Sequence, residues 1–386
     1  MEESIANPTA TTLATFDTEY SADAVEACPA HPHLFAVGTY QLLPSNTAVV
    51  DDDQGSQKKA IARTGRIYLH HLPEESATGG SDIDYINDAS LRPIQALDCP
   101  AVLDMKWGGL ESTTLAVGNS IGQVQLYSLN NTNDGAAPSL SFLSEAQVAT
   151  DLTTLCLSLD WSNRRHTPTH YPDTATEELS PSIAVSLSSG ELAVVAATPT
   201  GLVPTATWAA HTLEAWSVCY DPFSSGSTLY SGADDAAFCS WDVRVDPSAT
   251  GPTSRNTRAH GAGVCAVACS PYDEWTVCTG SYDDSLRIWD KRTLGPRAQP
   301  LHTLEMGGGV WRLKWGSGAN RNRIAVAGMY AGFFVVDLVD NEGTPTVTRE
   351  YTAHKSIAYG VDWVGHRGDT LATCSFYDHS LHVWSP

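Results

Sequence analysis

The sequence has few positive charges. Among its 386 residues, 22 are Lys or Arg and 44 are Asp or Glu, which gives a formal net charge of −22. A surface with this excess of negative charge repels the phosphates of nucleic acids and anionic lipid headgroups. We therefore expect no nucleic acid and no membrane among the partners of this protein, and a cationic ligand or partner suits it better.

Cysteine pairs with metal-binding spacing are also missing. The nine cysteines are scattered along the chain, and none belongs to a Cys-x-x-Cys motif, so the sequence indicates neither a zinc site nor a disulfide framework. Most of them lie in apolar, strand-like segments, where a thiol behaves as a small hydrophobic group. This usage indicates a reducing compartment.

Other signals are lacking too. No stretch of about 18 apolar residues occurs, and the N-terminus lacks a basic region followed by an apolar run, so we expect a soluble, cytoplasmic protein. There is no Gly-x-Ser-x-Gly motif to support a serine acyl-enzyme. The glycines at 307–309 lead into a strand-like segment, which removes the helix terminus that phosphate binding would use. We predict no metal and no cofactor.

One pattern is repeated. Thr279–Arg292 is typical of two short β-strands joined by a polar turn, Ser231–Arg244 repeats its Gly, Trp-Asp and Arg, and Thr373–Trp384 closes the chain. A β unit this small cannot bury its own faces and must stack on copies of itself. The sequence therefore predicts an all-β repeat architecture.

Seven such units can be counted, which predicts a single seven-bladed β-propeller over residues 11–386 after a disordered N-terminus at 1–10. The last unit stops at its third strand, so we expect the segment 11–17 to supply the missing outer strand and close the ring. The blades are expected near 20–71, 97–129, 152–208, 211–244, 260–304, 307–350 and 354–386. Insertions that are polar or rich in Pro, Ser and Gly are expected to be disordered surface loops, at 43–64, 73–96, 130–150, 163–182 and 246–257.

A His, a hydroxyl group, an Asp and a Trp recur in the clearest units, and they resemble the hydrogen-bonded strut of WD-repeat blades. A hydrolase triad has similar components, but repetition favours a structural role that satisfies buried polar groups. In the seventh blade Cys374 matches the hydroxyl position when counted back from Asp378, so that strut should be altered or shifted. The strut residues are His211, Ser231, Asp235 and Trp241, then His260, Thr279, Asp283 and Trp289, and finally His354, Asp378 and Trp384.

Several segments are not demanded by blade geometry: Asp17–Glu19 with Ser21–Glu26, Gly38–Leu42, Leu103–Trp107, Leu157–Trp161, Ala210–Trp216, Gly308–Trp315, Ile357–Trp363 and Leu371–His379. Together they resemble the diphthine methyl ester hydrolase family, in older usage diphthine methyltransferase, which consists of seven-bladed WD-repeat proteins of diphthamide biosynthesis. The resemblance runs from about Asp17 to Trp384. It implies an esterase that hydrolyses a carboxyl methyl ester on the modified histidine of translation elongation factor two, acting without a cofactor and as a monomer. The competing class is a non-catalytic propeller that scaffolds a protein assembly.

Diphthine carries a trimethylammonium group, and such cations bind over aromatic faces with about 0.5 to 2 kcal/mol per contact. Trp216, Trp311 and Tyr359 begin the inner strands of three blades, so repeat symmetry should bring them round one axis. They either form an aromatic cage or pack between blades. Glu214 and Tyr377 complete the predicted substrate-binding set.

One position further along the inner strands lie charged residues. They should face the central channel, because a buried unpaired charge is costly. Glu26 and Asp104 could attract the cation, and Arg312 could stabilise the developing oxyanion, although a channel-lining salt bridge is an equal alternative. Ester hydrolysis also needs a base that works near neutral pH. We expect His379 to be this base, with Glu26 or Asp104 next in line.

Overall fold

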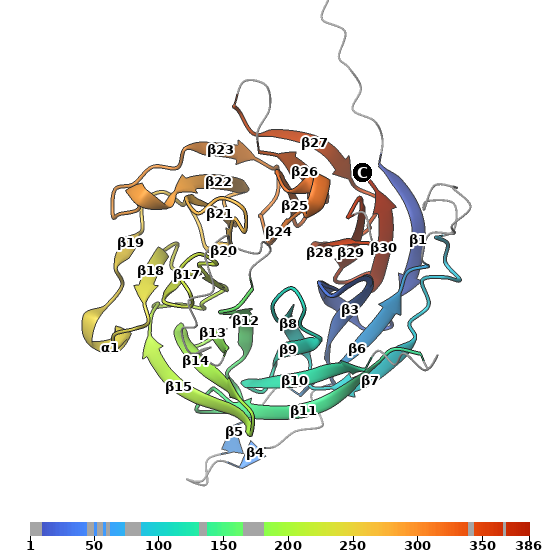
Figure 1. The fold of residues 1–386 in the computed structure, drawn as a ribbon, viewed down its shortest axis with the longest axis horizontal. Helices are drawn as coiled ribbons and strands as arrows, with labels where there is room; N and C mark the ends of the chain where they lie inside the picture. Colours follow the sequence, from blue (N-terminus) through green and yellow to red (C-terminus); the bar gives the residue numbers. More distant parts are fainter. Residues whose placement is uncertain are drawn as a thin grey trace, which may run out of the picture.

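The seven-bladed β-propeller predicted from the sequence is confirmed. The computed structural model describes residues 10–44, 50–51, 57–58, 62–73, 86–130, 137–164, 181–338, 343–365 and 368–386. Seven four-stranded antiparallel sheets surround a central axis (Figure 1), and β4 (Val50–Asp51) and β5 (Gln57–Lys58) form a separate two-stranded sheet. Residues 1–9, most of the expected disordered N-terminus, lie outside the described residues.

Each blade runs from an inner strand at the axis to an outer strand at the rim. The first three blades are β2 (Ser21–Cys28), β3 (His31–Leu42), β6 (Arg63–His71) and β7 (Gln95–Cys99); β8 (Val102–Trp107), β9 (Thr114–Asn119), β10 (Gln123–Asn130) and β11 (Ser139–Gln147); and β12 (Cys156–Trp161), β13 (Ser182–Leu187), β14 (Glu191–Thr198) and β15 (Gly201–Ala209). The next three are β16 (Ser217–Tyr220), β17 (Thr228–Gly232), β18 (Phe238–Asp242) and β19 (Ser254–Asn256); β20 (Val264–Cys269), β21 (Thr276–Ser281), β22 (Ser285–Asp290) and β23 (His302–Glu305); and β24 (Arg312–Trp315), β25 (Arg323–Ala327), β26 (Phe333–Asp337) and β27 (Thr346–Tyr351).

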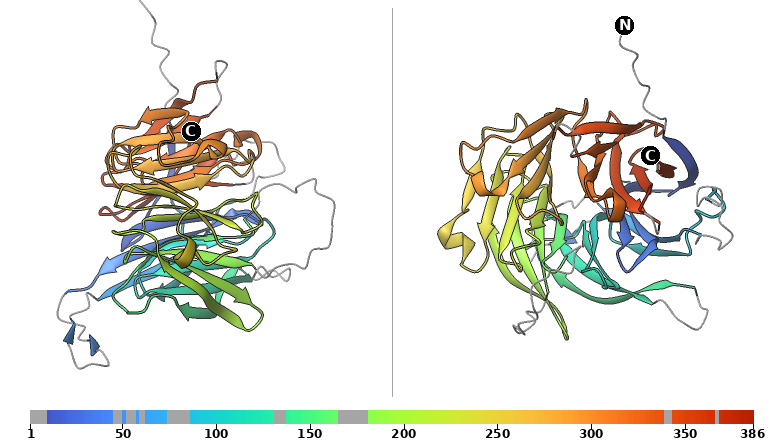
Figure 2. Two further views of the ribbon diagram at one scale, coloured as in Figure 1. Left: turned by 90° about the vertical axis from the view of Figure 1, so that its left-hand side faces the viewer. Right: turned by 45° about the horizontal axis from the view of Figure 1, so that its top comes forward.

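The N-terminal strand closes the ring, as the sequence predicts. The seventh blade contains β28 (Ala358–Val364), β29 (Thr370–Ser375) and β30 (Ser380–Ser385), and β1 (Thr11–Asp17) pairs antiparallel with β30 from Thr11 opposite Ser385 to Asp17 opposite Ser380. The blue strand β1 therefore lies beside the red seventh blade (Figure 2). Because β1 covers the edge of β30, the blade has no open seam there.

Burial of the strands explains the arrangement. The inner strands β12 and β20 are buried at every residue, whereas the outer strand β11 exposes most of its residues and buries Leu140 and Ala146. Tryptophans at the ends of inner strands also donate Nε1–H to a backbone carbonyl of the preceding blade: Trp107 to Glu26 at 3.1 Å, Trp161 to Lys106 at 2.9 Å, Trp315 to Ala268 at 3.4 Å and Trp363 to Lys314 at 3.1 Å. Apolar packing and these bonds together join one blade to the next.

Some segments expected to be loops contain blade strands. The strand β11 lies inside the expected loop 130–150, β7 begins just before the end of 73–96, and α1 (Pro247–Thr250) with β19 occupies 246–257. The strands β11 and β7 expose part of their residues to solvent and include Ser, Gln, Glu and Asp, and β19 consists of Ser, Arg and Asn, so their polar composition conceals a strand. The remainder of the expected loops includes 74–85, 131–136 and 165–180, which lie outside the described residues. No helix in the described ranges is long and apolar enough to cross a membrane.

Candidate functional site

The predicted strut is complete in the fourth blade. His211 places Nδ1 3.1 Å from Asp235 Oδ1 and Nε2 2.8 Å from Ser231 Oγ, and Trp241 donates Nε1–H to the same oxygen at 2.9 Å. His211 and Ser231 are buried. The four groups therefore satisfy one another inside the sheet, as a structural strut requires.

The other two struts differ. In the fifth blade His260 Nε2 lies 2.9 Å from Thr279 Oγ1, to which Trp289 also donates, but Asp283 binds Arg287 and the backbone N–H of Gly261 instead of His260. The expectation that Asp283 completes this strut is therefore corrected, because the Arg287 guanidinium takes both of its oxygens.

In the seventh blade the strut is shifted by one residue. His354 Nε2 lies 2.9 Å from Thr373 Oγ1, not at Cys374, and Trp384 donates to Thr373 at 3.2 Å. His354 Nδ1 lies 2.6 Å from Ser375 Oγ, which in turn binds Asp378. The turn here is one residue longer than in the fourth and fifth blades, so Ser375 bridges the histidine and the aspartate.

Strand register places the residues of the channel in layers. The inner-strand residues that pair with equivalent residues of the second strands (Gly38, Gly118, Ser186, Gly232, Gly280, Ala327 and Cys374) form an upper layer. They are Ala24, Asp104, Ser158, Ser217, Ala266, Arg312 and Gly360. Two residues further along, a lower layer contains Glu26, Lys106, Asp160, Cys219, Ala268, Lys314 and Asp362. Glu26 was expected beside Asp104 and Arg312, but the pairing of Ala24 with Gly38 puts it one layer deeper.

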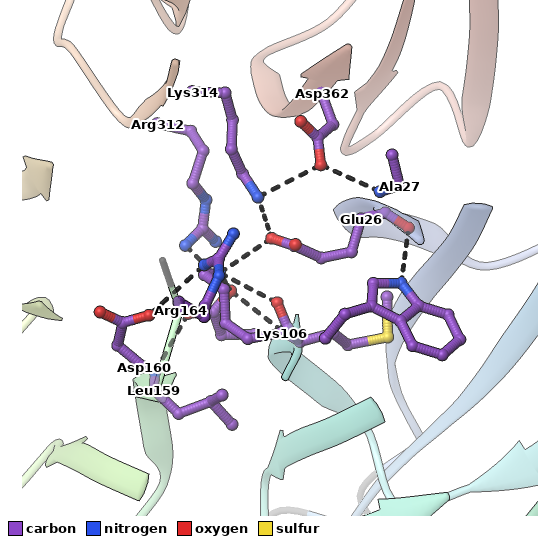
Figure 3. Close-up of polar contacts among 12 residues, drawn as sticks. Glu26, Ala27, Lys106, Leu159, Asp160, Arg164, Arg312, Lys314 and Asp362 are labelled. Carbon is purple, nitrogen blue, oxygen red and sulfur yellow. Dashed lines mark hydrogen bonds and ion pairs between the residues drawn. The ribbon is translucent and has the colours of Figure 1, made fainter. Parts of the chain in front are cut away.

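The charged residues of the lower layer form an ion-pair network (Figure 3). Glu26 binds the ammonium groups of Lys314 and of Lys106, the latter at 2.9 Å, and Lys314 also lies 3.4 Å from Asp362. Asp160 pairs with Arg164 at 3.4 Å. Burial alone would raise the pKa of Glu26, but the two lysines outweigh it and lower that pKa. The network borders a channel cavity of about 220 Å³.

Above the network, Asp104 and Arg312 form an ion pair with Nη1 3.2 Å from Oδ1. Asp104 also accepts from Lys106 Nζ at 2.6 Å and from the backbone N–H of Leu159 at 3.1 Å. Burial opposes ionisation of this carboxyl, but the lysine and arginine charges prevail and hold its pKa well below the usual range. Asp104 is thus a fully engaged carboxylate.

The residue before each upper-layer position forms what we call the mouth ring: Asp23, Leu103, Leu157, Trp216, Cys265, Trp311 and Tyr359. In five blades this residue is the extra residue of a β-bulge. A bulge re-aims a side chain relative to the regular strand. The mouth ring therefore presents a distinct set of side chains where the inner strands begin.

The aromatic members of the mouth ring are in contact. The ring centroids of Trp216 and Trp311 lie 5.4 Å apart, and those of Trp311 and Tyr359 lie 4.8 Å apart. Tyr282 and Phe376, from turns at the same face, extend the cluster, with Tyr282 6.0 Å from Trp311 and Phe376 4.9 Å from Tyr359. All five are half-buried. The predicted aromatic trio is thus one continuous surface at the mouth of the channel.

Two indole nitrogens distinguish the members of this cluster. Trp216 donates Nε1–H to Asp234 at 3.1 Å. Trp311 Nε1 is buried and has no hydrogen-bond partner among the residues that the structure describes. A buried donor without a partner is costly. The indole N–H of Trp311 is therefore an unsatisfied donor in this part of the structure.

Asp23 is the one acidic residue of the mouth ring, and sequence reasoning missed it. Its side chain is buried, with 3% of the residue exposed, and within the described ranges it forms no hydrogen bond or ion pair. Burial raises its pKa to about 8, with Arg312 lowering and Asp104 further raising it. The sequence signal that could have found it is Gly38 in the second strand of the first blade. If Ala24 is paired with Gly38, Asp23 takes the same position in its strand as Trp311 takes before Arg312.

The remaining predicted residues lie around the mouth. His379 is in the β29–β30 turn at φ +54°, and its carbonyl accepts from Thr18 N at 2.8 Å, but among the described residues no interaction joins its imidazole to Arg312. Tyr377 is 69% exposed, with its ring 5.0 Å from Phe376. Glu214 is half-buried before β16, and its carbonyl accepts from Asp234 N at 2.9 Å. The described residues contain no group of three or more His, Cys, Asp or Glu suited to hold a metal ion.

The blades and their struts define a WD-repeat propeller, and residues 251–290 match the family described as WD domain, G-beta repeat. A solved chain from a structure titled "Crystal Structure of Mitotic Checkpoint Complex" superposes on 100% of this chain and 94% of its own, with a TM-score of 0.63 and 16% identity. That likeness concerns the fold alone.

Relatives identify the family more narrowly. The chain is 31% identical over 367 residues to "Diphthine methyltransferase" of Homo sapiens, covering 91% of this chain and 74% of the relative. It is 29% identical over 390 residues to "Diphthine methyltransferase homolog" of Dictyostelium discoideum, covering 95% and 97%. This chain belongs to the diphthine methyltransferase family.

Proposed function

We propose that this protein hydrolyses the methyl ester of diphthine on translation elongation factor two. Membership of the diphthine methyltransferase family gives the chain a role in diphthamide biosynthesis, as an enzyme that acts on diphthine. The reaction type is our proposal: water attacks the carboxyl methyl ester, and methanol leaves. The enzyme acts in the cytoplasm as a monomer, and the methylated factor is its partner.

The aromatic cluster of the mouth ring is the observation that carries this proposal. Trp216, Trp311 and Tyr359 are in ring contact and half-buried where the channel opens. A quaternary ammonium group binds favourably over such faces because the ring quadrupole attracts it. The trimethylammonium group of diphthine therefore docks on this cluster, which places the nearby methyl ester over the upper layer.

Arg312 suits the stabilisation of the oxyanion that forms when water attacks the ester. It belongs to the upper layer, directly after Trp311 on the chain, and its recorded ion pair with Asp104 uses Nη1. Its other N–H groups have no acceptor among the described residues. A guanidinium held in place by one carboxylate can offer its remaining donors to a developing negative charge.

Purified protein mixed with elongation factor two carrying methylated diphthine tests the proposal. We expect stoichiometric methanol release without any added cofactor, and loss of the methyl group from the factor by mass spectrometry. Tight binding of the factor without methanol release would overturn the hydrolase proposal and support a non-catalytic scaffold. Unmethylated factor is the matched control, because it offers the same protein surface without the ester.

A further inference from the structure

We infer that Asp23 is the general base of this hydrolysis and that the cationic substrate itself brings Asp23 into its working, ionised form. The inference rests on the proposed function, since it assigns a residue to that reaction. It also replaces His379, Glu26 and Asp104 in the role of base.

Position is the first argument for Asp23. It is the bulge residue between the pairs Ala22–Thr39 and Ala24–Gly38, just as Tyr359 is the bulge residue between Ala358–Ser375 and Gly360–Cys374. Both strands begin at the mouth, and β2 and β28 lie in neighbouring blades. A cation seated on the aromatic members of the mouth ring therefore lies in the same ring as the Asp23 carboxyl.

The close approach of these two strands supports the placement. A Cβ added to Gly360 would lie 2.9 Å from Val25 N and 3.1 Å from the carbonyl carbon of Ala24. Only a glycine lets β28 come this near to the backbone that follows Asp23. Asp23 and Tyr359 are therefore held next to each other by the packing of β2 against β28.

The absence of partners for Asp23 is the second argument. It is 97% buried, and no group of the described residues donates to its oxygens. Glu26 forms ion pairs with two lysines. Asp104 forms ion pairs with a lysine and an arginine and accepts a hydrogen bond from a backbone N–H. A carboxylate with its lone pairs engaged and its charge stabilised is a weak base. Among the channel carboxylates that the structure describes, Asp23 alone keeps its oxygens for a water molecule.

The groups that face Asp23 determine how its charge responds. From β24 comes Arg312, from β8 Asp104, from β28 Tyr359 and from β29 Cys374, all of which interact with it electrostatically. Arg312 is already paired with Asp104, so the pair offers Asp23 little net charge. Burial keeps the pKa of Asp23 near 8 in the free protein. A bound trimethylammonium group adds an unpaired positive charge and lowers that pKa by about one pH unit or more.

The proton balance of the reaction is closed. Ionised Asp23 takes a proton from water, and the oxygen of that water bonds to the ester carbonyl carbon. The π electron pair of the C=O bond moves to the carbonyl oxygen. The carbonyl re-forms as the bond to the methoxy oxygen breaks. Asp23 returns its proton to that oxygen, so methanol leaves, and the new carboxylic acid loses its proton to solvent. Asp23 ends ionised, as it began.

Steady-state methanol release by the whole protein, with methylated elongation factor two as substrate, tests the inference. We expect Asp23→Asn to lower kcat by about 100-fold or more, as loss of a general base does, while the variant still binds the methylated factor. Asp23→Glu should recover part of the rate. Glu191→Gln, which alters the half-buried first residue of β14 in the third blade, serves as the control and should leave the rate unchanged.

The pH profile of the wild-type protein is a second readout that needs no variant. We expect kcat/KM to fall tenfold per pH unit below about 8, because it reports the free enzyme, and kcat to fall at a lower pH, because it reports the complex. A kcat/KM that is flat from pH 6 to 9, or an Asp23→Asn variant as active as wild type, would overturn the role of Asp23. No methanol from the wild-type protein would instead overturn the proposed hydrolysis.

Discussion

Asp23 and Tyr359 occupy the same bulge position in neighbouring blades, and their side chains interact electrostatically across the boundary between β2 and β28. One blade thus contributes a buried carboxyl to the mouth ring, and its neighbour contributes an aromatic face. The upper layer adds the Arg312 guanidinium directly beneath. These three groups are the ones that binding a quaternary ammonium ester and attacking it with water require.

Asp23 should destabilise the folded protein. Its pKa is raised from 3.8 to about 8 on folding, so between these values the native state holds a proton that the unfolded state has lost, and the free energy of unfolding falls as pH rises. Asp23→Asn removes this penalty. We expect its Tm at pH 8 to exceed that of the wild type by about 2 °C or more, measured by thermal denaturation.

The same comparison at pH 4 is the control for this prediction, because pH 4 is close to the unfolded pKa of 3.8, so the unfolded state keeps much of the proton and the difference should shrink. A variant that is less stable than wild type at both pH values would contradict the burial of an unpaired carboxyl at position 23. If Asp23→Asn gains stability and loses hydrolysis rate, Asp23 serves catalysis at a cost in stability.

Trp311 should contribute to substrate binding more than to the chemical step. Trp311→Ala removes the central face of the aromatic cluster, which we expect to raise KM by about 3- to 30-fold, in line with one or two cation–π contacts. Steady-state methanol release measures KM and kcat separately. Trp275→Ala is the matched control: Trp275 is 43% exposed and covers Arg292 where β21 begins, at the opposite face. An unchanged KM in Trp311→Ala, with the fold retained, would refute the cation-binding role.

Glu26 should stabilise the fold without acting as base. Glu26→Gln leaves Lys106 and Lys314 short of a buried counter-charge, and we expect it to lower the free energy of unfolding by about 3 kcal/mol. Its pKa is lowered in the native state, so its contribution is present above the unfolded pKa of 4.5 and is lost as pH falls through the native value. Urea denaturation at pH 7 and pH 4 measures both effects.

Glu19→Gln is the matched control for Glu26. Glu19 also pairs with a cation, Arg66 at 2.9 Å, but its side chain is 68% exposed, so its loss should cost less than about 1 kcal/mol. Equal effects of the two substitutions would show that the lower layer is not a buried network.

His379 should be dispensable for the chemical step. Its imidazole has no interaction with Arg312 among the described residues, and its backbone holds a turn at φ +54°. We expect His379→Ala to keep kcat within about tenfold of wild type, whereas loss of a general base costs about 10²- to 10⁴-fold. A loss in the latter range, with the turn and the fold intact, would restore His379 as the base.

The repeats themselves show why the fold is predictable from this sequence. Gly, Asp and Trp recur at the same offsets in Thr279–Arg292 and Ser231–Arg244 because the fourth and fifth blades use the same turn and the same buried Trp. A last unit with three strands requires a fourth from elsewhere, and Thr11–Asp17 supplies it. The outer strand β11 escapes prediction because most of its residues are exposed, and β19 because it consists of only three polar residues, so both leave little apolar pattern.

The candidate site is only partly predictable for a related reason. Trp216, Trp311 and Tyr359 stand out because an aromatic residue at the start of an inner strand is visible in the sequence. Asp23 does not stand out, because the β-bulge at this position adds one residue that the sequence pattern does not reveal. The same extra residue explains why Glu26 was expected in the upper layer but lies in the lower layer. In the seventh blade the longer turn displaced Thr373 from its expected place in the same way.

The isotope content of the products tests the central claim most directly. A single turnover of methylated elongation factor two is run in ¹⁸O-water without added cofactor, and both products are analysed by mass spectrometry. Attack of water on the ester carbonyl predicts one ¹⁸O atom in the diphthine carboxylate and unlabelled methanol. Labelled methanol with an unlabelled carboxylate, or demethylation that releases no methanol, would contradict an esterase that works through Asp23 and Arg312.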